Sequence, residues 1–331
     1  MTYDWVHNCL QDGVFTVEVQ KLLIACSEFG LTKAQVKADL RDPAWQFSAQ
    51  TRTKAKQLHR IFDPYRDASI DPNKIKCSAS ELLGLYDILR YIVAARLPRG
   101  APELQPKVMS FDAACNVLDI IVSAKRGCIQ VDQAATALEQ ALSLHMALHI
   151  AAYGTGGIKP KHHWNFDLPG QIRRDRIVID MFIIERLHLK IKSIAEPVKN
   201  TSQFERSVMA GVVNVSLKPT ADNNCWSHAL LGTRREIGDD MHEAKKMRVY
   251  GLLIEDDDVV FNGDKCGIVQ ACLLVSGVLH AVVENLSQQG NHTIHWGLWR
   301  PSSTYEVWVA APLTQSVAWR PADDGATLVL R

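Results

Sequence analysis

Hydrophobic residues in the first half of the chain recur at spacings of three and four, which predicts helices that bury one face. The pattern covers residues 14–29, 51–62, 82–97, 111–124 and 134–153. The last of these runs is apolar enough to form a central core helix. We also expect residues 158–236 to be mainly helical.

Capping residues support these helices at their ends. Gly30 can end the first helix, and Thr32 can cap a short second one. Ser78 and Glu81 have the spacing of a capping box before the third long run, and Gly154 breaks the run that ends at residue 153. The sequence therefore predicts the helices of the N-terminal half and the residues at which several of them begin or end.

From Glu243 onward the hydrophobic spacing shifts toward two, which predicts strands. The predicted strands cover residues 248–254, 259–261, 267–275, 278–284 and 306–311. Ser276-Gly277 favours a tight hairpin turn between two of them. We therefore predict an α+β fold with a mainly helical N-terminal two-thirds and a small C-terminal antiparallel β-barrel.

Composition excludes several classes of protein. The 331 residues are 47% hydrophobic and 22% charged, with a net charge of +1, so DNA binding through bulk positive charge is excluded. Residues 156–206 are locally basic, with 10 Lys and Arg against 6 Asp and Glu. The sequence has no secretory signal, no membrane-spanning stretch and no C-x-x-C pair among its eight cysteines, which predicts an intracellular protein with no membrane partner.

One carboxylate lies in an unusually apolar setting. Residues 171–195 predict a helix that is apolar all round, with Glu185 inside one apolar face and His188 and Lys192 further along the same side. A buried carboxylate has to be paired or bound to a metal, because an isolated buried charge is costly. Two interpretations stay open for Glu185, namely an ion pair with Lys192 or an arginine, and a metal ligand.

A basic loop precedes that helix. It contains Lys159, Lys161 and the adjacent His162 and His163. These histidines are candidates for phosphate contacts or proton transfer, and the alternative is that they are solvated loop residues.

A second histidine pair, His145 and His149, is four residues apart in the predicted core helix. The intervening Met-Ala-Leu supplies no glutamate for an H-E-x-x-H zinc site, so we interpret both as ordinary helix histidines. A zinc-dependent hydrolase built on them is the remaining alternative. The sequence also contains no P-loop, no dinucleotide fingerprint and no nucleophile elbow, which leaves carboxylates as catalytic candidates and predicts no nucleotide cofactor.

Three stretches together resemble one family. Asp4-Trp5-Val6-His7 resembles the D-x-M-H segment of cut-and-paste transposases of the CACTA-like DDE type, with Val6 at the methionine position. The run from Lys159 to His163 resembles their K-P-K-H-H element, and the run from Glu185 to Lys192 resembles the E-x-x-H-x-x-x-K helix that follows it. The resemblance covers residues 4–208.

This resemblance implies site residues and a cofactor. Asp4 and Glu185 would be the second and third catalytic carboxylates of an RNase H-like core and would hold Mg2+ or Mn2+ if the protein is active, with no cofactor otherwise. His7 and His188 would support them. The DNA-binding candidates are Lys159, Lys161, His162, His163, Arg173, Arg174, Lys190 and Lys192.

The resemblance also implies a domain organisation. Residues 1–12 would be a remnant core strand segment, 13–153 a helical insertion domain, 154–240 a basic, mainly helical segment, and 241–331 the β-barrel domain. The first catalytic Asp would precede residue 1. We therefore expect the C-terminal part of a transposase, inactive in DNA cleavage as it stands and nuclear if transposase-derived.

Two function classes follow. The first is a transposase-derived protein with residual DNA and divalent-metal binding. The second is a non-enzymatic interaction protein, a helical scaffold whose β-barrel binds protein or nucleic acid through an exposed patch around Trp296, Trp299 and Trp308. A homo-oligomer is compatible with both.

Overall fold

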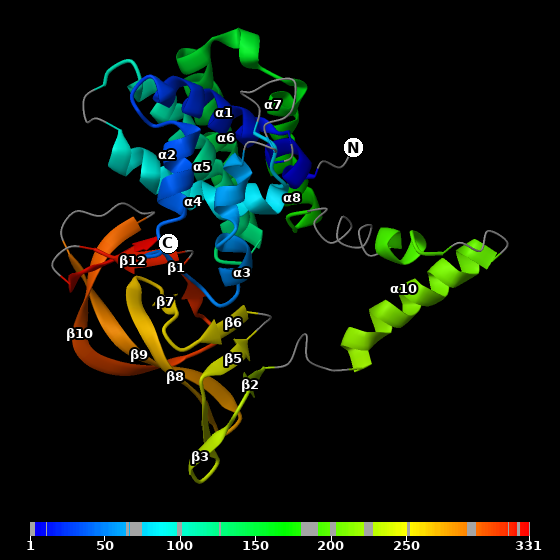
Figure 1. The fold of residues 1–331 in the computed structure, drawn as a ribbon, viewed down its shortest axis with the longest axis vertical. Helices are drawn as coiled ribbons and strands as arrows, with labels where there is room; N and C mark the ends of the chain where they lie inside the picture. The colour runs from blue at the N-terminus through cyan, green and yellow to red at the C-terminus, as the bar shows by residue number, and fades with distance from the viewer. Residues whose placement is uncertain are drawn as a thin grey trace. The chain divides into compact units, whose positions relative to one another are not determined.

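The fold of this chain, in a computed structural model, combines N-terminal helices with a C-terminal antiparallel sheet (Figure 1), as the α+β prediction expected. The structure describes residues 4–10, 12–63, 66, 75–97, 101–125, 127–179, 191–198, 203–221, 228–249, 252–289, 296–316, 318–322 and 325–330. These form two compact units: a helical unit from residues 1–42 and 54–183, and a sheet unit from residues 43–53 and 184–331. None of the described helices is both long enough and apolar enough to cross a membrane.

The helical unit is built from helices that follow one another along the chain. They are η1 (Val6–Leu10), α1 (Val14–Ser27), α2 (Lys33–Leu40), η2 (Leu58–Phe62), α4 (Ala79–Arg96), α5 (Gln105–Lys125), α6 (Val131–Tyr153), η3 (Thr155–Gly157), α7 (Pro160–Asn165) and α8 (Leu168–Asp175). Helix α5 packs against α1, α4 and α6, which makes it central to the bundle. Phe15 of α1 meets Phe111 of α5 at 5.7 Å and Tyr86 of α4 at 6.1 Å between ring centroids, so aromatic rings fill the space between these helices.

Local capping chemistry sets several helix ends as predicted. The Thr32 side chain accepts a hydrogen bond from Gln35 N at 3.2 Å, and Ser78 and Glu81 form the capping box of α4. Gly30 and Gly154 adopt positive φ of 86° and 71° after α1 and α6. That backbone conformation favours glycine, which explains why both helices end there.

Two predicted helices are interrupted in the structure. Residues 51–62 form the short α3 (Arg52–Ala55) and then the 3-10 helix η2, rather than one basic helix, although Leu58, Ile61 and Phe62 are buried as expected. The helix expected over residues 171–195 ends with α8 at Asp175. Arg176 takes a left-handed conformation there, its backbone N–H donates to Ile172 O, and its side chain pairs with Asp132. Residues 180–190 of the expected helix lie outside the described residues.

The sheet unit contains a curved antiparallel sheet that forms a half-barrel. Its strands are β1 (Gln46–Phe47), β3 (Arg235–Gly238), β4 (Met241–Ala244), β7 (Val259–Asn262), β8 (Lys265–Val275), β9 (Val278–Gln289), β10 (Trp296–Val309), β11 (Thr314–Gln315), β12 (Ala318–Pro321) and β13 (Thr327–Leu330). The order is β1-β12-β13-β10-β9-β8-β4-β3, with β7 paired to β8 and to β11. A second sheet of β2 (Ala229–Leu231), β5 (Lys246–Val249) and β6 (Leu252–Glu255) and the helix α10 (Phe204–Ala221) complete the unit.

Two expectations about this unit are corrected. Residues 229–238, expected to be helical, contain β2 and β3, because pairing with β5 and β4 outweighs local periodicity. Residues 248–254 are divided between the paired strands β5 and β6 instead of forming one strand. Strands β3 and β4, on either side of residue 240, pair with each other, and the predicted division of the chain into domains stays a prediction.

The expected tryptophan patch is also corrected. Trp299 and Trp308 are buried in the two cores of the sheet unit, and Trp308 donates its indole N–H to Glu306 at 2.8 Å. The exposed apolar side chains of β10 are instead Tyr305, Val307 and Val309. Trp299 and Trp308 are therefore core residues, whereas Trp296 at the start of β10 is half-buried. The interaction-protein hypothesis itself stays a prediction.

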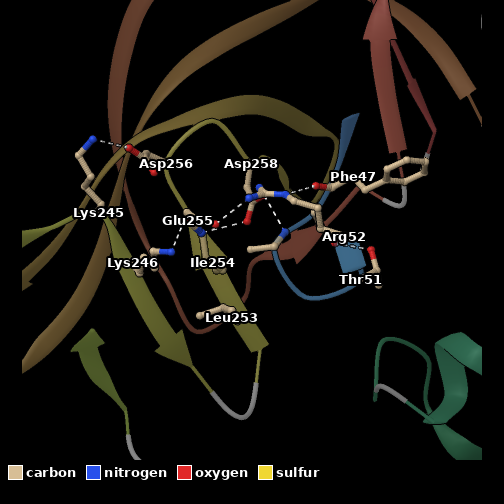
Figure 2. A network of polar contacts seen from close by, with 12 residues as sticks. Phe47, Thr51, Arg52, Lys245, Lys246, Leu253, Ile254, Glu255, Asp256 and Asp258 are labelled. Atoms are coloured by element: carbon tan, nitrogen blue, oxygen red, sulfur yellow. Dashed lines mark hydrogen bonds and ion pairs between the residues drawn. The ribbon is translucent and has the colours of Figure 1, made fainter. Parts of the chain in front are cut away.

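An N-terminal segment, residues 43–53, belongs to the sheet unit. Its strand β1 pairs with β12, and the Arg320 guanidinium lies 5.3 Å from the Trp45 ring centroid. Figure 2 shows the polar contacts of the same segment around Asp258. The Asp258 carboxylate accepts hydrogen bonds from Ala49 N at 3.0 Å and Glu255 N at 2.9 Å, and Arg52 donates to Glu255 at 3.0 Å.

Candidate metal centre

A carboxylate and two imidazoles meet inside the helical unit. Glu18 lies in the middle of α1 and is fully buried. His145 and His149 are four residues apart on α6, a spacing that places both on one face of the helix. His145 Nε2 lies 2.9 Å from Glu18 Oε1, and His149 Nδ1 contacts the same oxygen.

The sequence around Glu18 forces the carboxylate into the core. Val17, Val19, Leu22 and Leu23 of the same helix are all buried, so the helix has little solvent-facing surface near its centre. A carboxylate in such a setting is stable only with charged or hydrogen-bonding partners. The two histidines on α6 supply them.

A hydroxyl and the electrostatics of the group keep Glu18 ionised. Ser110 Oγ of α5 donates to Glu18 Oε1 at 3.0 Å. Burial raises the pKa of Glu18, but the hydrogen bonds and the charges of His145 and His149 outweigh burial and lower that pKa to about 2. The centre therefore offers a carboxylate anion to any cation between the three side chains.

A third imidazole, His162 of α7, lies against this group. Its ring centroid is 5.0 Å from that of His149 and 6.4 Å from that of His145, and the side chain is buried. Burial and the neighbouring charges of His149 and His145 lower the pKa of His162 to about 4. Lys159 N donates to His162 Nδ1 at 3.0 Å, so the neutral ring carries its proton on Nε2.

Four buried polar atoms in and around this group have no hydrogen-bond partner among the described residues. They are Glu18 Oε2, His149 Nε2, Tyr153 OH and His162 Nε2. Native proteins leave few such atoms unsatisfied, because each costs about 1–3 kcal/mol. Their concentration at one place indicates that a polar species other than these side chains belongs there.

A cation lies at the edge of the group. Lys21 Nζ, one turn along α1 from Glu18, is 4.7 Å from the Tyr153 ring centroid. A methyl group built on Gly157 would lie 2.3 Å from Lys21 Nζ and 3.6 Å from His149 Nε2, so both nitrogens approach the same glycine. The missing side chain of Gly157 makes room for the ammonium group beside the histidine.

The geometry of the three side chains is compatible with a bound metal. One ligand atom from each of Glu18, His145 and His149 can be chosen so that all three lie within 4.8 Å of one another, and this group could hold a metal ion. Two imidazoles and one carboxylate are the protein ligands of several zinc and iron sites that keep a further position open.

The catalytic residues expected from the transposase resemblance are placed only in part. The Asp4 carboxylate accepts hydrogen bonds from Val6 N at 3.1 Å and His7 N at 3.3 Å and contacts His7 Nδ1, so Asp4 and His7 interact at the start of η1. Glu185, His188 and Lys190 lie outside the described residues. The proposed pairing of Asp4 with Glu185 therefore stays a prediction.

The basic residues at the start of α7 divide between surface and interior. Lys159 and His163 are exposed, whereas His162 is buried against the centre. Lys161 is half-buried, and its ammonium group donates to His7 O at 2.8 Å. Two of these four DNA-binding candidates thus face solvent.

The other described DNA-binding candidates lie on the surface in ion pairs. Arg173 pairs with Glu139 at 2.8 Å, and Arg174 pairs with its neighbour Asp175 at 2.8 Å. Lys192 lies 3.7 Å from Glu196. Their role in DNA binding is a prediction that the structure does not test.

The contacts of His145 and His149 with Glu18 were not predicted from the sequence, and the interpretation of both as ordinary helix histidines stays a prediction. Both contact a buried carboxylate that comes from α1, more than a hundred residues earlier in the chain. A search for H-E-x-x-H misses this carboxylate because it looks only between the histidines. The available signal was Glu18 itself, a charged residue in the middle of an apolar helical run.

Comparisons with known proteins identify no relative of this chain. No model of a protein family matches it, and neither the curated proteins nor the solved structures give a match. What this centre does therefore has to be argued from its own side chains.

Proposed function

We propose that the helical unit binds one divalent transition-metal ion, with Zn2+ as the preferred ion, through Glu18, His145 and His149. The observation that carries the proposal is the convergence of these three buried side chains on one point, surrounded by polar atoms that have no partner among the described residues. One carboxylate and two imidazoles match the donor atoms that such an ion requires.

The donor atoms favour Zn2+ over the Mg2+ or Mn2+ that the transposase resemblance implies. Imidazole nitrogen suits zinc, copper, iron and nickel, whereas magnesium prefers sites made of oxygen atoms. Two of the three donors here are nitrogens. The Mg2+ or Mn2+ expectation belongs to Asp4 and Glu185 and remains a separate prediction.

Three protein ligands leave a metal with an open position, which is the arrangement of catalytic rather than purely structural zinc sites. A metal ion held in this way acts as a Lewis acid toward an oxygen atom in the open position. The side chains of Ser110 and His162 would hold the ligands and their surroundings in place, as outer partners do in known metal sites.

The test is metal binding by the full chain after removal of metal with a chelator. We expect Zn2+ or Co2+ to bind with a stoichiometry of one, measured by elemental analysis and by the visible spectrum of the Co2+ form. His149→Ala should abolish this binding, whereas His163→Ala, at the exposed histidine next to His162, should not. Equal metal content in wild type and His149→Ala would refute the proposal.

Descent from a DDE-type transposase, with an RNase H-like core and DNA binding, stays a second proposal. It is supported by the order of the three sequence stretches and by the solvent exposure of Lys159 and His163. Its test is salt-dependent binding of duplex DNA that weakens when Lys159 is replaced by Ala. Binding that is independent of salt and of Lys159 would contradict it.

A further inference from the structure

The hydrogen bond to His162 fixes which of its atoms can contact a ligand. Because Nδ1 accepts the Lys159 N–H, the proton of the neutral ring is on Nε2. A nitrogen that carries a proton cannot bind a metal ion through a lone pair. His162 in this arrangement is therefore a hydrogen-bond donor beside the metal ligands, and its Nε2–H has no acceptor among the described residues.

Charge around the centre favours an anion. A divalent ion with one carboxylate ligand leaves one positive charge in a buried environment, and a buried charge is stable only when it is compensated. Lys21 adds a second positive charge, held between the Tyr153 ring and Gly157. The side chains of Glu18, His145, His149 and His162 are each more than nine-tenths buried, which restricts the anion to a small one.

We propose that the centre binds a small oxyanion of the size of formate in the position that Glu18, His145 and His149 leave open, with the His162 Nε2–H as donor and Lys21 as countercharge. This inference rests on the proposed metal site. It assigns a role to His162 and Lys21, neither of which is a ligand of the metal. It also gives the donor at His162 Nε2 an acceptor.

The experiment uses the full chain loaded with Co2+ and titrated with sodium formate at constant ionic strength. The visible absorption of Co2+ responds to its coordination, so formate binding should give a saturable spectral change. The Co2+ spectrum before formate is added tests the proposed metal site by itself. An absence of Co2+ binding refutes both proposals, whereas bound Co2+ with no response to formate refutes only this one.

Two pairs of variants test the assigned residues. His162→Phe keeps a buried ring without the donor and should weaken formate binding about tenfold or more, as loss of a hydrogen bond to a charged group does. His163→Phe, at the exposed neighbour, should leave formate binding unchanged.

The second pair does not alter the imidazole cluster itself. Gly157→Ala puts a methyl group where the Lys21 ammonium lies, and Gly156→Ala places one in open space on the same turn. We expect Gly157→Ala to weaken formate binding severalfold and Gly156→Ala to have no effect. Equal formate affinities in wild type, His162→Phe and Gly157→Ala, or formate binding to the metal-free protein with the same affinity, would overturn the proposal.

Discussion

Among the described residues, each unit buries one carboxylate completely, Glu18 in the helical unit and Asp258 in the sheet unit, and the two are satisfied in opposite ways. In the sheet unit, Asp258 accepts hydrogen bonds at both oxygens, from Ala49 N, Glu255 N and Gln315 Nε2 (Figure 2). In the helical unit, the polar contacts of Glu18 with Ser110, His145 and His149 all involve Oε1, and Oε2 has no hydrogen-bond partner among the described residues.

The difference separates a structural carboxylate from a candidate binding group. The donors to Asp258 are mainly backbone N–H groups, which cannot leave, so this carboxylate joins three segments of the chain. The partners of Glu18 are imidazoles, which exchange protons and bind metals. Burial alone does not distinguish the two residues, whereas the chemical identity of their partners does.

Among the variants that test this comparison, Glu18→Gln is expected to have the largest effect, on the affinity for Zn2+. The variant keeps the shape of the side chain but removes the anion, so we expect affinity for Zn2+ to fall more than about 100-fold, beyond the effect of losing an outer partner. Competition with a chromophoric chelator measures this. Glu28→Gln, at the exposed end of the same helix, is the matched control, and a similar Zn2+ affinity in all three proteins would contradict the assignment.

Asp258→Asn tests the structural half of the comparison. An amide has one acceptor oxygen, so at least one N–H donor loses its partner and we expect the sheet unit to lose about 2–3 kcal/mol of unfolding free energy. Urea unfolding followed by the fluorescence of the buried Trp299 and Trp308 measures the change. Asp257→Asn, at the exposed neighbour with φ of 67°, should be nearly neutral because asparagine tolerates that conformation.

Added Zn2+ should stabilise one unit and not the other. At a free concentration one hundred times the dissociation constant, binding contributes about 2.7 kcal/mol to the stability of the folded form that holds the ion. We expect hydrogen exchange to slow in α1 and α6 and to stay unchanged in β8 and β9. Equal protection of both units, or none, would argue against a discrete site at Glu18.

The smallest expected effect is the contribution of Asp258 to the pH dependence of stability. Burial raises the pKa of Asp258 to about 6, despite the lowering effect of hydrogen bonds from Glu255 and Ala49 and of Arg52. A carboxyl whose folded pKa exceeds its unfolded value stabilises the fold fully below pH 4 and loses that contribution as pH rises toward 6.

The stability of wild type relative to Asp258→Asn should therefore fall by on the order of 1–3 kcal/mol between pH 4 and pH 6 and stay level above it. Denaturant unfolding of both proteins at each pH isolates this group from other titrating residues. A relative stability that rises over this interval would show that the hydrogen bonds outweigh burial.

Local signals predicted much of the fold and little of the site. The positions of Thr32, Ser78 and Gly154 set helix ends through contacts within a few residues, so the sequence alone revealed them. Strands β2 and β3 are stabilised by pairing with β5 and β4, and no local periodicity marks them. The candidate metal centre combines residues of α1 and α6, with His162 of α7 against them, and only the tertiary packing shows that Glu18 contacts His145 and His149.

The segment from residue 43 to 53 has a consequence for how the chain can be assembled. Its partners in the sheet unit, such as Glu255 and β12, come more than two hundred residues later. At a synthesis rate of about 5–20 residues per second, residues 43–53 remain without these partners for tens of seconds after they are synthesised. Expressing residues 184–331 alone would remove β1 from the edge of the sheet, so a clean cut between the two units does not exist in the linear sequence.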